Sequence, residues 1–333
     1  MVQYLIRRVG YMLVTLLGIS ILAFIVIQAP PGDYLDIYIQ QLRERGIETD
    51  REELAGLEAR YGLNQPVLVQ YFKWMGNLIT LDLGKSLATQ QEVIDILGER
   101  VPLTAMITLL TTVFTFAVAI PIGIFAATHQ YSLTDYSVST LGFIGLATPN
   151  FLLALILMFL ASRWLGVSIG GLYSPEMVTA PFSLAKLWDL IKHLPVPIIV
   201  VGTAGTAALI RIMRATMLDE LRKQYVITAR SKGVEEQRLL FKYPVRIAVN
   251  PLVSTIGWLL PEIISGETVT AIVLSLPTVG PLLLTALLQQ DMYLAGSIIV
   301  VLSLLTVVGT LLSDLLLAVV DPRIRMERKA AAA

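Results

Sequence analysis

The residue types that usually perform enzyme chemistry are sparse in this sequence. The chain of 333 residues has no cysteine, which excludes a disulfide, a thiolate zinc site and an iron–sulfur cluster. Its two histidines, His129 and His193, lie far apart and have no partner histidine at metal-ligand spacing, so we interpret both as structural or interfacial. We therefore expect no metal site and no catalytic residue.

Two short motifs resemble known signatures but lack the context that each signature needs. Residues 166–170 have the G-x-S-x-G spacing of a nucleophile elbow, which works only as a strand-to-helix turn on an α/β sheet. Residues 84–86, Gly-Lys-Ser, match the end of a phosphate-binding loop, yet Ile79 stands where the first glycine must be. Neither motif predicts catalysis or ATP binding by this chain.

The composition excludes an ordinary soluble domain. Hydrophobic residues make up 55% of the chain and charged residues only 15%, whereas about a quarter of the residues in soluble domains are charged. The formal net charge is zero, so no overall positive field exists to attract nucleic acid. A membrane protein is the class that remains.

Long uncharged stretches predict helices that cross the membrane. Five runs of 24, 34, 27, 18 and 22 residues lie between successive charged side chains, and a spanning helix needs about 20 apolar residues. A sixth segment carries Glu262 and Glu267 but is otherwise apolar, and the chain must cross once more to place both basic ends on one side. We therefore expect an all-α fold in which the first transmembrane helix precedes five spans at about 102–128, 136–162, 195–213, 247–275 and 293–320.

The orientation follows from the lysines and arginines that flank the expected spans. Fifteen of them lie before the first span, between 211 and 246, and after 322, all on one side of the membrane. Short cytoplasmic flanks carry such an excess, so both termini are expected in the cytoplasm. The segments 30–100 and 163–194 are then extracytoplasmic.

The cytoplasmic segment 211–251 carries nine basic side chains. At mid-bilayer they would cost roughly 20–30 kcal/mol in total, so its central part must leave the membrane. Apolar residues recur at helical spacing through 217–228, Gly233 is placed to end that helix, and a second short helix is expected over 235–242. The result would be a rigid knob on which Ala229 and Gly233 allow close approach by another protein; the alternative is a solvated basic loop.

The segment RATMLDELRKQYVITARSKG resembles the signature loop of ABC-importer permeases of the dipeptide and oligopeptide type. The similarity continues in PEIISGETVTAIVLSLPTVGPLLLTALLQQDMYLAGSIIV, in SDLLLAVVDPRIR, in ATPNFLLALILMFLAS and in YGLNQPVLVQYFKWMGNLITLDLGKSL, and therefore covers nearly the whole chain. The first two positions of the general importer motif are replaced by Ile227 and Thr228, whereas Ala229 and Gly233 are retained. The core Thr228–Gly233 matches the peptide-type subfamily.

The resemblance implies the type I ABC importer permease fold with six transmembrane helices, in the cytoplasmic membrane of a bacterium or archaeon. It implies a heterodimer with a second permease, two ABC ATPase subunits that bind ATP and Mg, an extracytoplasmic substrate-binding protein and contact with membrane lipid. This chain itself would be non-catalytic and hold no cofactor. The expected organisation is an N-terminal helix with an extracytoplasmic segment (1–100), a permease domain (101–323) with a coupling loop (214–246), and a cytoplasmic tail (324–333).

The resemblance also implies roles for particular residues. The substrate would be a di- or oligopeptide, with nickel chelates, glutathione or oligosaccharides as alternatives; an ion-coupled secondary transporter is disfavoured because the sequence shows no internal repeat. Intramembrane acids usually face a bundle interior or a water-filled cavity, so Glu262 and Glu267 are candidates for meeting the ammonium group of a peptide, whereas Asp314 better fits a hydrogen bond between helices. The expected ATPase-coupling residues are Tyr225, Thr228, Ala229, Arg230, Lys232, Gly233 and Glu235. The candidates for the translocation path are Glu267, Glu262, Pro149 and Asn150.

Overall fold

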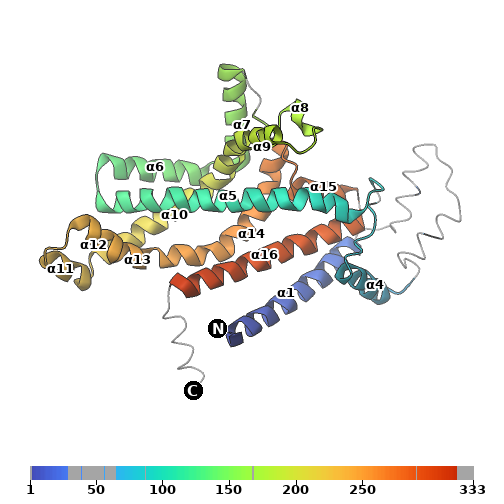
Figure 1. Cartoon of the computed structure of the whole chain (residues 1–333), viewed down its shortest axis with the longest axis horizontal. Coiled ribbons are helices and arrows are strands. Elements are labelled where there is room, and N and C mark those ends of the chain that lie inside the picture. The colour runs from blue at the N-terminus through green and yellow to red at the C-terminus, as the bar shows by residue number, and fades with distance from the viewer. Residues whose placement is uncertain are drawn as a thin grey trace. The chain divides into compact units, whose positions relative to one another are not determined.

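The computed structural model is helical throughout its regular elements (Figure 1). The only strand-like pairing in the described part of the chain is one isolated antiparallel bridge between Lys85 and Glu92. The chain forms two units, one of Met1–Thr104 with Thr278–Val307 and the other of Ala105–Pro277 with Val308–Ala333. The structure describes residues 2–28, 39, 56, 65–86, 88–166, 169–289 and 291–320.

Four helical segments in the described part are long and apolar enough to cross a membrane. The first and last lie in α1 (Val2–Gln28) and α16 (Met292–Val320), and the second is α5 (Val93–Thr128). The remaining one joins α9 (Leu184–His193) to α10 (Pro195–Leu221). These helices contain the expected first span and the expected spans at 102–128, 195–213 and 293–320.

The expected span 136–162 is not one straight helix. It consists of α6 (Leu133–Ala147) and α7 (Asn150–Leu160), which continues as the short π-helix η1 (Ala161–Leu165), and the chain bends by 103° between α6 and α7. Thr148 at the bend is extended, with ψ of 119°, because the ring of Pro149 disfavours helical geometry in the residue before it. Counted as one span, the pair makes a fifth membrane-crossing candidate.

The expected span at 247–275, the fifth along the chain, coincides with the helix α14 (Asn250–Val273) over most of its length. Several side chains of α14 lie outside the described residues, and α14 is not among the segments identified as membrane-crossing within the described part. The six-span topology therefore stays a prediction.

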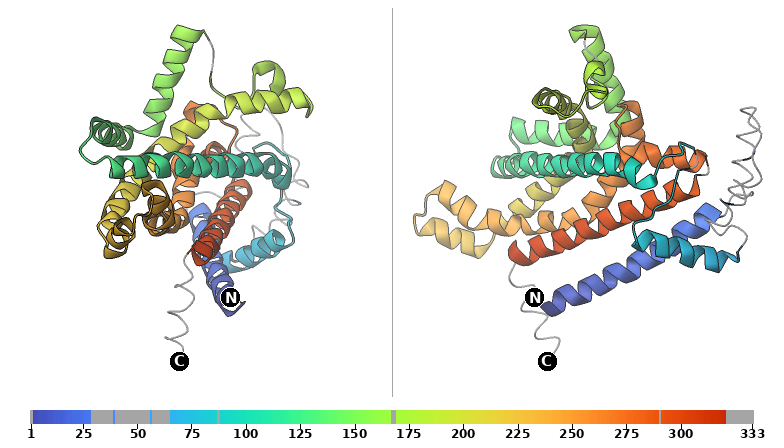
Figure 2. Two further views of the ribbon diagram at one scale, coloured as in Figure 1. Left: turned by 60° about the vertical axis from the view of Figure 1, so that its left-hand side comes forward. Right: turned by 45° about the vertical axis from the view of Figure 1, so that its right-hand side comes forward.

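In the first unit, an aromatic cluster joins α1 to α4 (Val67–Ile79), which crosses near the end of α1 (Figures 1 and 2). The ring of Phe24 lies 5.4 Å from that of Tyr71 and 5.7 Å from that of Trp74. The hydroxyl groups of Tyr71 and Ser20 share a buried hydrogen bond of 2.9 Å. Aromatic packing of this kind, with its polar group satisfied, fixes α4 against α1.

The Gly-Lys-Ser motif at 84–86 has a structural role in this unit. The Ser86 hydroxyl donates a 2.7 Å hydrogen bond to the Asp291 carboxylate, which is 1% exposed. Asp291 also accepts hydrogen bonds from the backbone N–H groups of Ala88 and Leu294, the second as a residue that caps a helix does. The motif therefore anchors the loop after α4 to the start of α16.

The second unit is built around α10, whose buried side chains run along most of its length. Its neighbours are α6, α7 and α14, together with the short α13 (Pro244–Ala248). Gly123 of α5 allows α10 to come close, because a Cβ atom at that position would lie 2.6 Å from the Cβ atom of Met213. Such close packing makes α10 the element through which the others are connected.

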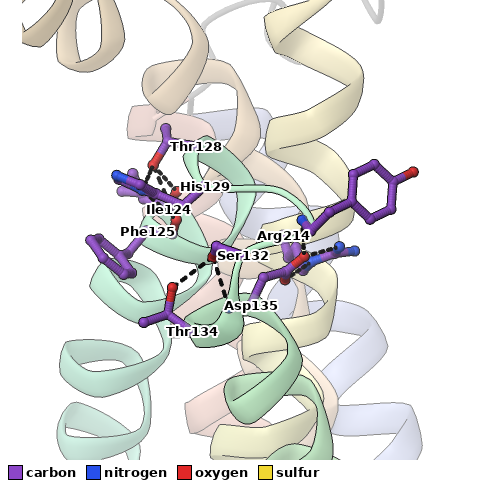
Figure 3. Close-up of polar contacts among 9 residues, drawn as sticks. Ile124, Phe125, Thr128, His129, Ser132, Thr134, Asp135 and Arg214 are labelled. Carbon is purple, nitrogen blue, oxygen red and sulfur yellow. Dashed lines mark hydrogen bonds and ion pairs between the residues drawn. The ribbon is translucent and has the colours of Figure 1, made fainter.

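A charged pair fixes the turn between α5 and α6 to α10 (Figure 3). The Arg214 guanidinium donates to both oxygens of Asp135, over 2.6 Å from Nε and 2.8 Å from Nη2. Asp135 is 2% exposed and also accepts from the backbone N–H of Tyr131, while the Ser132 hydroxyl accepts from its backbone N–H and caps α6. Two parallel charge-assisted hydrogen bonds hold one geometry more strongly than a single contact does.

Replacing Asp135 by Asn should destabilise the protein by about 2–4 kcal/mol, because it leaves the half-buried Arg214 without its counter-charge. The measurement is the midpoint of thermal unfolding in detergent, with Asp219→Asn on the exposed face of α10 as the matched control. The double variant Asp135→Asn/Arg214→Gln should recover part of the loss. Equal midpoints for Asp135→Asn and the control would contradict the assignment.

Candidate functional site

Three short helices form the basic segment that follows α10. They are α11 (Gln224–Ser231) and α12 (Glu236–Lys242), which lie together near the end of α10 (Figure 2), and α13, which packs alongside α10. We call residues 224–248 the knob. The helix expected to continue through 217–228 instead breaks at 222–223, where Lys223 is extended. The break turns α11 so that its apolar side faces α12.

The knob has a small apolar core of its own. Val226 and Leu239 are both 0% exposed, and Ala229 packs with them. Ala229 was expected to allow close approach by another protein; here it allows close approach by α12 of the same chain. A segment that buries its own apolar side chains keeps one shape, which a solvated loop does not.

Gly233 ends α11 as the sequence predicts. Its φ is +73°, in the left-handed region. The N–H of Gly233 donates to the carbonyl oxygen of Arg230, and the N–H of Val234 donates to that of Ala229, which together make a Schellman motif. A side chain at this position would meet no atom within 4 Å, so the glycine is required by the backbone conformation and not by space within this chain.

Two polar contacts brace the knob. The Tyr225 hydroxyl donates a 2.5 Å hydrogen bond to the Glu220 carboxylate at the end of α10, and burial raises the pKa of Tyr225. Arg230 of α11 pairs with Glu236 of α12 at 2.6 Å, and the hydrogen bond from Arg230 holds the pKa of the Glu236 carboxyl below its usual value. At neutral pH Tyr225 therefore stays protonated and Glu236 stays ionised, so both contacts persist.

The structure divides the expected coupling residues into two groups. Tyr225 is half-buried and Ala229 buried, so both support the knob from within. The others are exposed and form its outer surface: Thr228, Arg230, Lys232, Gly233 and Glu235. Sequence reasoning missed three exposed apolar side chains in the same segment, Ile227, Phe241 and Ile247.

The knob is attached to the rest of the second unit at two points besides Tyr225. The Thr216 hydroxyl of α10 donates to the Ala248 carbonyl oxygen of α13 over 3.1 Å. Ala248 and Leu252 are buried against Met213 and Met217 of α10. The knob is therefore packed firmly against α10 and α14.

Two of the expected path residues meet in one cavity of the second unit. Asn150 at the start of α7 and Glu262 of α14 line a cavity of about 80 Å³ with residues of α5 and α10. Pro149 lies at the bend before α7 and does not line it. Glu267 is in α14, but its side chain lies outside the described residues.

Sequence reasoning missed Thr115 of α5, which also lines this cavity. Threonines recur along one face of α5 at 104, 108, 111, 112 and 115, and all five are buried. Their helical spacing was the signal that could have identified this polar face. Gly202 and Gly205 of α10 lie opposite Thr115. A Cβ atom added at either glycine would be within 3.7 Å of the Thr115 side chain.

The two histidines and the described residues of the 166–170 motif lie outside the knob and are not among the residues that line the cavity. Gly166 ends η1 with a left-handed φ of +66°, and Ser168 of the 166–170 motif lies outside the described residues. His129, which directly follows α5, stacks on Phe125 of that helix at 4.3 Å. His193 contacts the carbonyl oxygen of Asp189 one turn earlier over 2.8 Å.

Two family models together cover most of the chain. Residues 119–326 match the binding-protein-dependent transport system inner membrane component, and residues 1–108 match the N-terminal part of such membrane components. The first region includes the knob, the bent α6–α7 pair and the residues that line the cavity from α7, α10 and α14, but not Thr115 of α5.

Curated relatives are similar over almost their full length. An oligopeptide transport system permease protein of Bacillus subtilis is 37% identical, covering 97% of this chain and 99% of the relative. A di/tripeptide transport system permease protein of Pseudomonas aeruginosa and a dipeptide transport system permease protein of Escherichia coli are each 30% identical, covering 98% of this chain and 100% of each relative. Together with the apolar helices and the matched regions, they establish that the chain belongs to the family of inner membrane components of binding-protein-dependent transport systems, and is a multi-pass protein of the cytoplasmic membrane.

Proposed function

We propose that this chain is one permease subunit of an ATP-driven importer of di- and oligopeptides. The observation that carries the proposal is the knob, a basic segment with its own core and an exposed charged surface, in a chain of this transport family. The peptide substrate is supported by the relatives, which are named as oligopeptide, dipeptide and di/tripeptide permeases.

The proposed topology has six transmembrane helices and both termini in the cytoplasm. α14 serves as the fifth span, and the bent α6–α7 pair as the third. The basic side chains before α1, in the knob and after 322 then share the cytoplasmic side, as the positive-inside rule requires. Residues 1–100 contribute the first helix and an extracytoplasmic segment, 101–323 form the permease domain and 324–333 the tail.

The knob is proposed to dock on an ABC ATPase subunit. Its exposed face, with Thr228, Arg230 and Lys232, would enter a groove of that subunit, and ATP and Mg would be bound there and not by this chain. Tyr225 and Ala229 would act from within, by holding α11 in place against Glu220 and Leu239.

Movement would pass from the knob to the membrane through the Thr216–Ala248 hydrogen bond and the packing of α13 on α10. Packed helices switch between discrete arrangements and do not deform continuously. Closure of the ATPase dimer would thereby select an arrangement of α10 and α14 in which the cavity opens to one side of the membrane.

The complete importer would hold a second, related permease, two ATPase subunits and an extracytoplasmic substrate-binding protein. The path for the peptide would run along α7, α10 and α14, where Asn150 and Glu262 line the cavity. Glu267 is a further candidate for the path through its position in α14. Pro149 would act indirectly, by bending the chain so that Asn150 reaches the cavity.

Reversing the charge in Arg230→Glu should lower ATP-driven peptide uptake about tenfold, the effect of losing roughly 1.4 kcal/mol of docking free energy. Insertion into the membrane should be unchanged, because the side chain is exposed. The measurement is uptake by the assembled importer in proteoliposomes, together with its ATPase activity.

The swapped variant Arg230→Glu/Glu236→Arg separates docking from internal support. It restores the ion pair between α11 and α12 with the charges exchanged, but not the charge pattern offered to a partner. Uptake should stay low. Recovery to the level of the unmodified importer would show that Arg230 serves only the shape of the knob.

A reporter fused at about residue 180, between α8 (Pro175–Val178) and α9, should behave as extracytoplasmic. Alkaline phosphatase should be active at this position, and a green fluorescent protein exported in unfolded form should be dark. A matched fusion at residue 234 in the knob should give the opposite pair of signals. Activity of the same reporter at both positions would overturn the proposed topology.

A further inference from the structure

The cavity that brings Asn150 and Glu262 together has the chemistry of a binding site for a positively charged amine. We infer that it binds a primary ammonium group, the amino end of the imported peptide. The inference rests on the proposed function for the identity of the peptide, but the charge preference of the cavity stands on its own geometry.

Thr115 supplies the observation that points to a ligand. Its side chain is 0% exposed and lines the cavity, and its hydroxyl oxygen has no hydrogen-bond partner within the described part of the chain. Buried hydroxyl groups in proteins nearly always have such a partner. Because the oxygen has almost no accessible surface, an ammonium group in the cavity would donate to it once the side chains around Thr115 move apart.

Glu262 gives the lining of the cavity a negative charge. Among the described residues that line the cavity it is the one charged side chain, and no lysine, arginine or histidine accompanies it. Glu262 is exposed in this chain, so its side chain can meet a ligand. A carboxylate attracts a cationic ligand and repels a phosphate or another carboxylate.

The size of the cavity limits what it holds. About 80 Å³ accommodates an ammonium group and its first carbon but not a whole dipeptide. Gly202 allows α10 to pack closely against α5 beside the cavity, because a Cβ atom there would lie 3.0 Å from Cδ1 of Phe114 and 3.3 Å from the Thr115 hydroxyl oxygen. The remainder of a peptide would have to extend out of the cavity.

A metal ion fits the same residues poorly. Ca²⁺ takes six to eight oxygen ligands, whereas the side chains here offer one carboxylate, the amide oxygen of Asn150 and one hydroxyl. Three acceptors of this kind match the three N–H donors of a primary ammonium group. The number of acceptor groups in the cavity therefore favours an amine over a divalent cation.

The absence of cysteine from the sequence allows a direct test. Ala204 lines the cavity from α10, and Ala204→Cys places a single thiol there. The assembled importer carrying this variant is labelled with cationic aminoethyl methanethiosulfonate and with neutral methyl methanethiosulfonate. The ratio of the two rates reports the preference for an ammonium group and cancels changes in the reactivity of the thiol.

The ratio should fall about tenfold when Glu262→Gln is added, and 10 mM ethylammonium should slow the labelling only when Glu262 is present. The matched control Glu176→Gln, on the exposed surface of α8, should leave the ratio unchanged. An equal ratio with and without Glu262 would overturn the inference.

Uptake by the assembled importer tests the link to the peptide. Glu262→Gln should lower dipeptide uptake about tenfold, while the affinity of the binding protein for the dipeptide is unchanged. Normal uptake in this variant would overturn the assignment of the cavity to the peptide. If the unmodified complex imports no peptide at all, the proposed function fails while the labelling ratio still reports the cavity, so the two claims fail separately.

Discussion

The cost of placing basic side chains in hydrocarbon is the constraint on which the rest of this structure depends. In the proposed topology, nine lysines and arginines between 211 and 246 keep the segment between two spans out of the membrane. The expelled segment stays ordered because Val226, Ala229 and Leu239 give it a core and Gly233 gives it a sharp turn. A part that must be both charged and rigid is well suited to transmit force from another protein.

The cost of burying a charged group also explains how acidic side chains are held elsewhere in the chain. Asp135 is buried against Arg214 with both carboxylate oxygens bonded, and Asp291 is buried with its oxygens bonded to Ser86 and to backbone N–H groups. Each of these acids fixes two segments to each other and is fully satisfied. Thr115 and Glu262 differ, because no lysine, arginine or histidine is among the described residues that line their cavity, and the Thr115 hydroxyl has no hydrogen-bond partner among the described residues.

Much of this organisation could be predicted from residue patterns. Uncharged runs located α1, α5, α10 and α16 because length and hydrophobicity alone decide such helices, and Gly233 predicted the end of α11. The pairing of Asp135 with Arg214, 79 positions apart, could not be predicted because no local pattern records it. Likewise the interior position of Ala229 depends on the break at Lys223, which tertiary packing imposes on a sequence with continuous helical spacing.

The central claim is that an ATPase subunit binds the outer surface of the knob. Cysteine introduced at Thr228, in a chain that otherwise has none, tests it by cross-linking in the assembled importer with a short bifunctional thiol reagent. The account predicts a cross-link to the ATPase subunit, and protection of the same cysteine from a soluble maleimide. Full reactivity with the maleimide and no cross-link in the intact complex would contradict it.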